Sequence, residues 1–208
     1  MAAPTDRIRA AFDATPRRDF LPRGVRRRAG YDGPLAIAAG QTSSQPRTVE
    51  DMLRLLDVRP GQRVLDVGSG SGWTTALLAH LVGPTGSVLG VELEPELVAF
   101  GSANLARTDR PWASIRQATP GVLGDPDGAA YDRVLVSAMA DALPAPLVDQ
   151  LASGGRLVHP VGPGGREQVT AFHKEAGRLV GDAWLTPAYF VPLVGAHGIR
   201  SREGRNER

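Results

Sequence analysis

The sequence predicts an α/β fold with a doubly wound, mostly parallel sheet, an antiparallel C-terminal edge and an N-terminal extension of helix and loop. Short, almost continuous apolar segments alternate with helix-length segments through the middle of the chain. This alternation is typical of a parallel sheet with helices on both faces. A glycine-rich turn joins the first of these strands to a helix, and beyond Gly165 strand follows strand with no helix between.

The N-terminal extension is expected to contain two helices. The first follows Thr5 and has Ile8 and Phe12 on one face, four residues apart. Prolines then interrupt the helical pattern, and loop is expected as far as Ala39. The second helix follows Pro46 and is expected to end at Pro60-Gly61. Its apolar stripe has the i, i+3, i+4, i+7 spacing that packs against a core: Val49, Met52, Leu53 and Leu56.

The rest of the chain is expected to form the sheet and its helices. The expected parallel strands are Arg63–Val67, Ser87–Val91, Ala113–Gln117, Arg133–Ser137 and Arg156–Val161. The expected helices between them are Thr74–Val82, Pro95–Arg107 and Pro146–Leu151. The expected C-terminal strands are Gln168–His173, Leu179–Trp184 and Tyr189–Val194. We expect one domain, divided into an extension (1–60), a core (61–165), C-terminal strands (166–197) and a disordered tail (198–208).

Composition limits the class of protein. A chain of 208 residues with 42% hydrophobic content suits one domain with a real core. The absence of cysteine excludes disulfides, thiolate zinc sites and a cysteine nucleophile. No apolar run approaches the ~18 residues of a membrane span, and the N-terminus lacks the apolar core of a secretory signal. We expect a cytoplasmic monomer that binds no membrane.

The charge balance does not favour a nucleic-acid partner. Net charge is only +2 although the chain has 24 basic residues, of which Lys174 alone is lysine. The two arginine clusters, at 17–28 and 200–208, are interpreted as a solvated surface and a tail. We therefore expect no binding of nucleic acid.

The segment Asp66–Gly72 is predicted to bind a nucleoside. Its glycines permit a sharp turn and a close approach of backbone to ligand. Glu92 ends the next strand, 20 residues beyond Gly72, where a carboxylate accepts hydrogen bonds from ribose hydroxyls. The alternative is that the glycines serve a turn alone. The predicted cofactor-binding residues here are Asp66, Gly68, Ser69, Gly70, Gly72, Glu92 and Leu93.

The glycine spacing argues against a dinucleotide. The dinucleotide fingerprint has a glycine at the sixth position, which is Trp73 here when the count begins at Gly68. Asp66, two residues before the first glycine, instead resembles the loop of class I methyltransferases, in which no pyrophosphate has to be held. Trp73 itself is interpreted as core packing over the loop.

A hydroxyl-rich segment, Gly40–Pro46 (Gly-Gln-Thr-Ser-Ser-Gln-Pro), stands just before the second helix. From spacing alone it fits either a turn with helix capping or a functional loop. It resembles the GQTxSQP motif of protein-L-isoaspartate O-methyltransferases, and the likeness covers nearly the whole chain. The other matching segments are Thr15–Pro22 (PRxxFxP), Tyr31–Leu35 (YDxPL), Val64–Gly72, Leu151–Gly162 (LxxGGRLVxPVG) and Phe190–Leu193 (FVPL).

This resemblance implies a Rossmann-like class I methyltransferase. Its methyl donor would be S-adenosyl-L-methionine and its acceptor the free α-carboxylate of L-isoaspartyl residues in damaged proteins or peptides. By the match, Ser44 takes the place of the active-site serine, and Thr42 lies beside cofactor and substrate. A carboxylate is already ionised at neutral pH, so no general base, no catalytic triad and no metal is expected. The four histidines form no constellation along the sequence.

Three positions depart from the family pattern. Thr119 stands where the family has an aspartate that hydrogen-bonds the adenine amino group, and it is retained as a predicted cofactor contact. Ser137 keeps the hydroxyl of the family's "VTAA" segment, while Met139 is expected to add bulk near the site. Tyr189 replaces a common arginine. These departures leave two alternatives open: a divergent methyltransferase for another carboxylate, and a non-catalytic binding module with the same fold.

Overall fold

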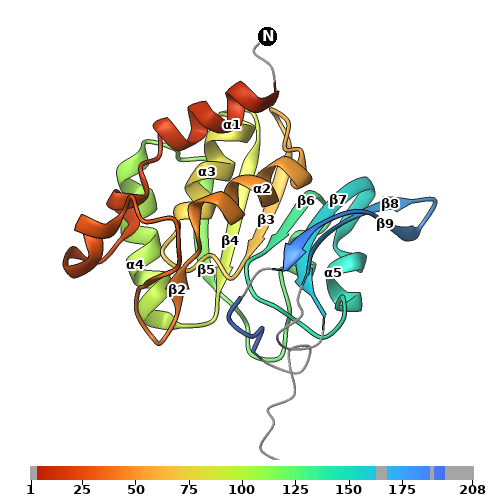
Figure 1. Cartoon of the computed structure of the whole chain (residues 1–208). Coiled ribbons are helices and arrows are strands. Elements are labelled where there is room, and N and C mark those ends of the chain that lie inside the picture. The colour runs from red at the N-terminus through yellow and green to blue at the C-terminus, as the bar shows by residue number, and fades with distance from the viewer. Residues whose placement is uncertain (1–3, 163–167, 188–189, 195–208) are drawn as a thin grey trace, which may run out of the picture.

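The computed structural model describes residues 4–162, 168–187 and 190–194. They form a seven-stranded sheet in the order β5-β4-β3-β6-β7-β8-β9 (Figure 1). The strands are β3 (Arg63–Val67), β4 (Ser87–Glu92), β5 (Ala113–Gln117), β6 (Tyr131–Val136), β7 (Leu151–Val161), β8 (Gln168–Glu175) and β9 (Arg178–Pro187). The strands from β5 to β7 are parallel, whereas β8 is antiparallel to both of its neighbours. The predicted fold class is confirmed.

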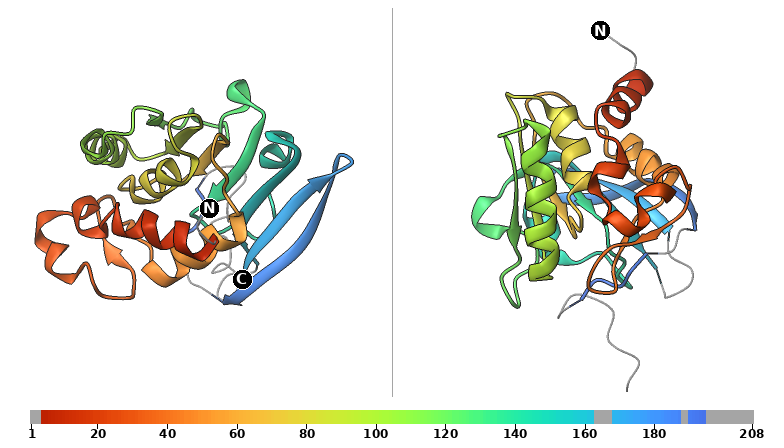
Figure 2. Two further views of the ribbon diagram at one scale, coloured as in Figure 1. Left: turned by 90° about the horizontal axis from the view of Figure 1, so that it is seen from above. Right: turned by 90° about the vertical axis from the view of Figure 1, so that its left-hand side faces the viewer.

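Helices cover the sheet unequally (Figures 1 and 2). The helices are α1 (Pro4–Asp13), α2 (Pro46–Leu56), α3 (Trp73–Val82), α4 (Pro95–Leu105) and α5 (Ala145–Asp149). Short 3-10 turns lie at Arg17–Phe20, Arg23–Arg28, Ala106–Thr108 and Pro126–Gly128. One core cluster joins α1, α2 and α3 to one face of the sheet, and a second covers the other face together with α5.

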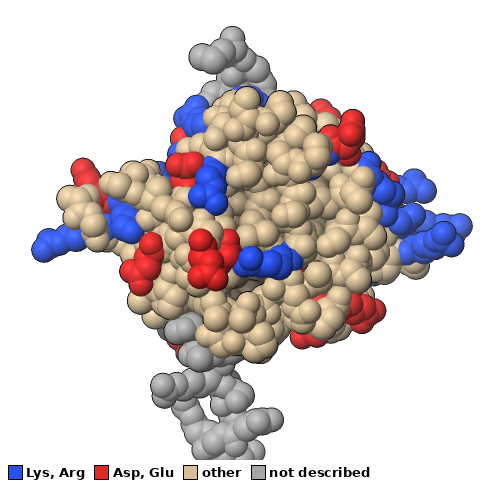
Figure 3. Space-filling view, turned by 180° about the vertical axis from the view of Figure 1, so that it is seen from behind, with Lys and Arg blue, Asp and Glu red and all other residues tan. Residues whose placement is uncertain are grey.

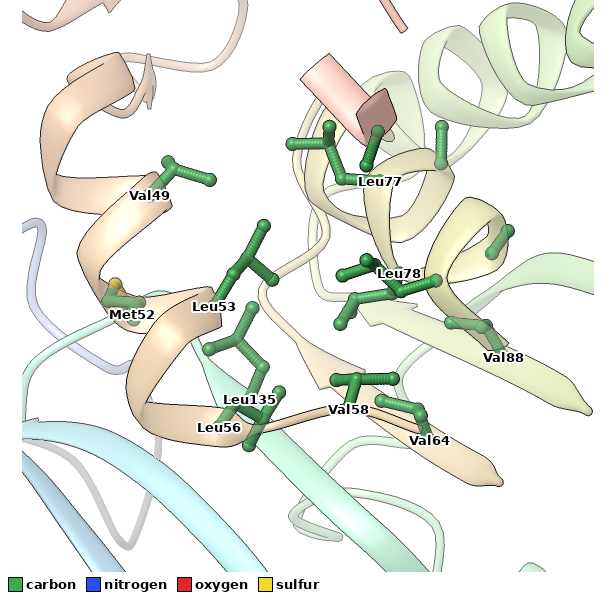
Figure 4. Close-up of a cluster of buried hydrophobic side chains, with 14 of the residues drawn as sticks. Val49, Met52, Leu53, Leu56, Val58, Val64, Leu77, Leu78, Val88 and Leu135 are labelled. Carbon is green, nitrogen blue, oxygen red and sulfur yellow. The ribbon is translucent and has the colours of Figure 1, made fainter. Parts of the chain in front are cut away.

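Helix α2 shows how the predicted stripe builds the core. Its four apolar residues are at most 2% exposed, and they face Leu77 and Leu78 of α3 and Leu135 of β6 (Figure 4). Pro46 lies at the start of the helix, where its missing N–H is not needed. The helix ends at Leu56 because Asp57 adopts a left-handed conformation with φ of 49°. This is earlier than the predicted end at Pro60.

One prediction for the N-terminal extension and one for the C-terminal strands are wrong. The expected loop up to Ala39 contains the 3-10 turns Arg17–Phe20 and Arg23–Arg28 and the short strand β1 (Leu35–Ala36), which pairs antiparallel with β2 (Thr42–Ser43) beyond it. The expected strand Tyr189–Val194 is not a strand over residues 190–194, and Tyr189 lies outside the described residues. Pro192 has no N–H to donate, and the segment instead contacts the chain after β6 through a single bridge at Met139.

The surface and the helices bear on two further expectations. Seen from behind, side chains of both charges are scattered over the surface, and basic side chains gather at the right-hand edge of the face shown (Figure 3). Over the residues that the structure describes, none of the helices has the length and apolar character needed to cross a lipid bilayer.

His159 gives the fold an acid sensitivity. The side chain is fully buried in β7, and its interaction with the backbone of Ala138 is too weak to offset burial. Burial lowers the pKa of His159 to about 4. As the pH falls below about 6.5, the unfolded chain binds a proton at this residue while the folded chain does not. The free energy of unfolding therefore does not depend on the protonation of His159 above pH 6.5, and it decreases as the pH falls from 6.5 towards 4.

We expect His159→Leu to remove this dependence. Relative to the variant, the wild type should lose about 1.4 kcal/mol of unfolding free energy between pH 7.5 and pH 5.5, at 1.36 kcal/mol per pKa unit. Denaturant unfolding of both proteins at the two pH values measures it. Asp66, whose pKa burial raises to about 6, has the opposite slope but is present in both proteins and cancels in the difference. A difference between the two proteins that does not change with pH would contradict the assignment to His159.

Candidate active site

A cavity of about 350 Å³ lies at the carboxyl ends of β3, β4 and β6. Ligands of open α/β sheets bind at this edge, and the volume is that of a small-molecule site. Five segments far apart in the sequence line most of it: 41–44, 67–71, 91–94, 118–124 and 191–194. Ile37, Trp73, Thr74, Ser137 and Ala138 complete the wall.

Three backbone amides of the glycine loop are already occupied by other groups of the chain. Gly68 and Gly70 have φ of 79° and 52°, which favour glycine. The amides of Gly68 and Ser69 donate to the carbonyl of Val91 at 2.9 and 3.2 Å, and the amide of Gly70 donates to Glu92 Oε2 at 2.8 Å. A pyrophosphate needs such amides free. The geometry therefore favours a nucleoside ligand without phosphates, as predicted from the glycine spacing.

Glu92 is positioned by three amides. Its Oε2 accepts from Gly70, while Oε1 accepts from Leu93 and Glu94 at 2.7 and 3.1 Å. A carboxylate has about four acceptor positions, so Oε2 keeps capacity for a ligand hydroxyl. Ser69 Oγ, also in the cavity wall, is buried without a partner among the described residues. A polar ligand group fits this pair.

Asp66 and Gly72, both predicted to bind cofactor, do not line the cavity. Asp66 is fully buried, and its Oδ2 accepts from the hydroxyls of Thr74 and Thr75 at 2.8 and 2.7 Å. Gly72 precedes α3 with φ of 83°, and a Cβ there would lie 2.9 Å from the carbonyl oxygen of Gly101. Asp66 therefore attaches the end of β3 to α3, and Gly72 lets the loop pack closely against α4.

Trp73 starts α3 as a packing residue. It is 3% exposed, its indole N–H donates to the carbonyl of Thr15 at 3.0 Å, and Phe12 meets its ring edge-on. The interpretation of Trp73 as core packing is confirmed, although part of its ring also reaches the cavity wall.

The hydroxyl-rich loop forms another part of the cavity wall. Thr42, Ser43 and Ser44 all line the cavity, and β1–β2 pairing places Leu35 beside Ser43. Asp32 fixes the far end of the loop, because it accepts from the Arg47 amide at 3.0 Å and from the side chain of Gln45 at 3.1 Å. The Arg47 amide is the main reason why the pKa of Asp32 is lowered.

The segment 118–124 brings Thr119 into the cavity wall. A buried polar cluster behind it holds the segment in place. Asp125 accepts from Tyr131 and, at 2.6 Å, from Arg116. Gln150 accepts from the Asp125 amide at 2.6 Å and donates to the carbonyl of Leu123 at 2.8 Å. Nothing in the sequence pattern linked these side chains, since they lie on different elements.

The chain after β6 closes the cavity. Ser137 lines it, and the Ser137 amide donates to the carbonyl of Val67 at 2.9 Å. Met139 is buried but not in the wall, so the expected bulk near the site does not enter the cavity. Its backbone instead bonds Val191 and Leu193 at 2.9 and 2.7 Å. Residues 191–194 and Ile37 were not predicted as site residues, and the FVPL match was the only signal for 191–193.

The cavity wall contains no histidine among the residues that the structure describes. His80, His159 and His173 all lie elsewhere, and His197 is outside the described residues. The wall offers hydroxyls, backbone amides and two carboxylates, Glu92 and Glu94. Chemistry that needs a positioned hydroxyl rather than an imidazole base fits this set.

Comparison with known proteins gives consistent matches. A family model described as Protein-L-isoaspartate(D-aspartate) O-methyltransferase matches residues 2–198. The chain is 43% identical over 194 residues to a protein-L-isoaspartate O-methyltransferase of Aeropyrum pernix, covering 93% of this chain and 75% of that one. It is 39% identical over 199 residues to the protein-L-isoaspartate O-methyltransferase of Methanopyrus kandleri, covering 96% of this chain and 88% of that one.

Solved structures agree. A protein-L-isoaspartate O-methyltransferase structure superposes with a TM-score of 0.81 at 27% identity, covering 93% of this chain and 62% of that one. A putative protein-L-isoaspartate O-methyltransferase from Plasmodium falciparum, in complex with S-adenosyl-L-homocysteine, gives a TM-score of 0.79 at 27% identity, covering 89% of each chain.

Proposed function

This chain belongs to the protein-L-isoaspartate(D-aspartate) O-methyltransferase family, and we propose that it methylates the free α-carboxylate of L-isoaspartyl residues in damaged proteins and peptides. S-adenosyl-L-methionine is the methyl donor. The observation that carries the proposal is that one cavity is lined by the glycine loop, by Glu92 and by Thr42 and Ser44 together. A nucleoside and a carboxylate substrate can therefore meet inside it.

The residues in the wall suit a sulfonium nucleoside. Glu92 would accept from the ribose through Oε2, and the glycines leave room that a Cβ would take. The unpartnered Ser69 hydroxyl would meet a polar group of the amino-acid part. Thr119 would lie against the base, with Leu93 and Ser137 completing the contact.

Bound there, S-adenosyl-L-methionine supplies an electrophilic methyl group. The chain has to align one carboxylate oxygen of the substrate with that methyl, and alignment of this kind can supply roughly 7–11 kcal/mol of a barrier. Ser44 and Thr42 can donate hydrogen bonds to the carboxylate without adding a competing charge. No proton has to be removed, because the nucleophile is ionised at neutral pH.

Methyl transfer to paired peptides tests the function. We expect wild-type protein to label an L-isoaspartyl peptide and to leave the aspartyl peptide of the same sequence unlabelled. Equal labelling, or none, would contradict the proposal. Labelling of another carboxylate alone would instead support a divergent carboxyl methyltransferase.

Thr119 offers a gain-of-affinity test. If it occupies the position of the family's adenine-binding aspartate, Thr119→Asp should tighten S-adenosyl-L-methionine binding about tenfold, because a hydrogen bond to a charged group contributes about 1.5–3 kcal/mol. Calorimetric titration measures the affinity. Thr85→Asp is the control, since Thr85 is exposed and lies outside the cavity wall. Unchanged or weaker binding by Thr119→Asp would contradict the placement.

We also propose that the protein acts as a cytoplasmic monomer that binds neither nucleic acid nor membrane. Light scattering at assay concentrations tests the monomeric state, and an active dimer would contradict it.

A further inference from the structure

Arg17 is a buried cation next to the hydroxyl-rich loop. It is 5% exposed, and among the described residues it forms no ion pair. Burial lowers the pKa of Arg17 to about 10, so the guanidinium stays charged at neutral pH. Its Cζ lies 5.5 Å from the ring centre of Trp73, directly after the glycine loop. A buried cation of this kind needs a structural or functional reason.

Four hydrogen bonds attach Arg17 to the loop. Nη1 donates to the carbonyl of Tyr31 at 3.0 Å, and Nη2 donates to the carbonyls of Gly33 and Ser43, both at 2.9 Å. Nε donates to the Ser43 hydroxyl oxygen at 3.1 Å. The guanidinium thus joins strand β2, which contains Thr42 and Ser43, to the turn that precedes β1.

The contact with the hydroxyl fixes how Ser43 can be used. Arginine has no acceptor atom, so Ser43 Oγ must be the acceptor in this bond. Its own hydrogen is then left for another acceptor, and Ser43 Oγ donates to no described residue. Ser43 lines the cavity between Thr42 and Ser44. The hydroxyl hydrogen of Ser43, a residue of the cavity wall, is therefore not taken up by any acceptor among the described residues.

We propose that Ser43 is a third hydroxyl donor to the substrate carboxylate and that Arg17 is the positioning residue that orients it. This rests on the proposed function. A carboxylate only accepts hydrogen bonds, and a hydroxyl polarised by a neighbouring cation is a stronger donor to an anion. The family motif leaves position 43 open, so the assignment comes from the contact with Arg17 rather than from the resemblance.

Ser43→Ala is the discriminating variant. It removes the hydroxyl and keeps the backbone bonds of Arg17 to Tyr31, Gly33 and Ser43. We expect KM for the isoaspartyl peptide to rise about tenfold, while the affinity for S-adenosyl-L-methionine stays within threefold. Ser153→Ala, at an exposed serine outside the cavity wall, is the matched control.

A carboxamide analogue separates recognition from loop damage. The probe is the same peptide with its α-carboxylate replaced by a carboxamide, tested as an inhibitor of methyl transfer. Ser43→Ala should weaken binding of the carboxylate peptide about tenfold more than binding of the carboxamide. Equal weakening of both would indicate a disturbed loop and would overturn the proposal.

The role of Arg17 is tested through Ser43. Arg17→Lys keeps the charge but loses the planar fork, and we expect it to weaken carboxylate preference. In the Ser43→Ala background it should have little further effect on that preference, because Arg17 acts through the hydroxyl. Arg27→Lys, at an exposed arginine, is the control. Additive losses would overturn the positioning role. An active wild type with unchanged Ser43→Ala would overturn this inference alone, whereas an inactive wild type would overturn the function as well.

Discussion

Glu92→Gln is expected to weaken S-adenosyl-L-methionine binding about 100-fold. The substitution removes a charged acceptor for the ribose, and such a hydrogen bond contributes about 1.5–3 kcal/mol. It also disturbs the loop. One oxygen of Glu92 accepts a hydrogen bond from the Gly70 amide, and the other accepts from the amides of Leu93 and Glu94. In glutamine one of these oxygens is replaced by an NH2 group, which is a donor and faces a backbone donor. Both effects act on cofactor affinity. Calorimetric titration gives the change directly, as a 100-fold loss corresponds to about 2.7 kcal/mol.

Glu96→Gln is the matched control for the loss of one negative charge. Glu96 is exposed in the first turn of α4 and lies outside the cavity wall. We expect its affinity to stay within threefold of wild type. Thermal unfolding of both variants shows whether Glu92→Gln remains folded. A folded Glu92→Gln protein with wild-type affinity would rule out Glu92 as the ribose acceptor.

The core of the fold was predictable because its signals are local. Arg63–Val67 agrees with the observed strand residue for residue, since a short apolar run between turns defines a buried parallel strand. Ala113–Gln117 agrees as well, although it is the exposed edge strand of the sheet. The β1–β2 pair was not predictable in this way. Its strands have two residues each, and the bonds from the distant Arg17 help to hold them together.

The cavity could be located from the sequence, but not all of its residues. Glycines and an acidic residue at the ends of successive strands meet at one edge of a parallel sheet, so the positions of Gly68, Gly70 and Glu92 follow from topology. Asp66 was assigned to the ligand because it belongs to the loop motif. Its actual partners, Thr74 and Thr75, become visible only when α3 packs over β3. Motif membership did not decide which way the side chain points.

The chemistry of the acceptor limits what the hydroxyl loop can do. In methyl transfer to a carboxylate the nucleophile loses its negative charge on the way to the ester. A hydrogen bond to the attacking oxygen is therefore stronger in the bound substrate than in the transition state, and it cannot accelerate the reaction by stabilising charge. Hydroxyls that speed the reaction must act by orientation, which is consistent with a loop fixed at both ends by Arg17 and Asp32.

Ser44→Ala is accordingly expected to lower kcat by at least about 10²-fold, because a displacement of about 1 Å from the aligned position can have an effect of that size. The variant should bind S-adenosyl-L-methionine within threefold of wild type, since Glu92 and the glycine loop do not contact Ser44 through any hydrogen bond of the described residues. Single-turnover methyl transfer at saturating peptide separates this loss from weaker peptide binding. Ser44→Thr keeps the hydroxyl and should recover part of the rate. If Ser44→Ala turns over at the wild-type rate, the carboxylate is aligned by other groups, and Thr42 and Ser43 become the residues to test.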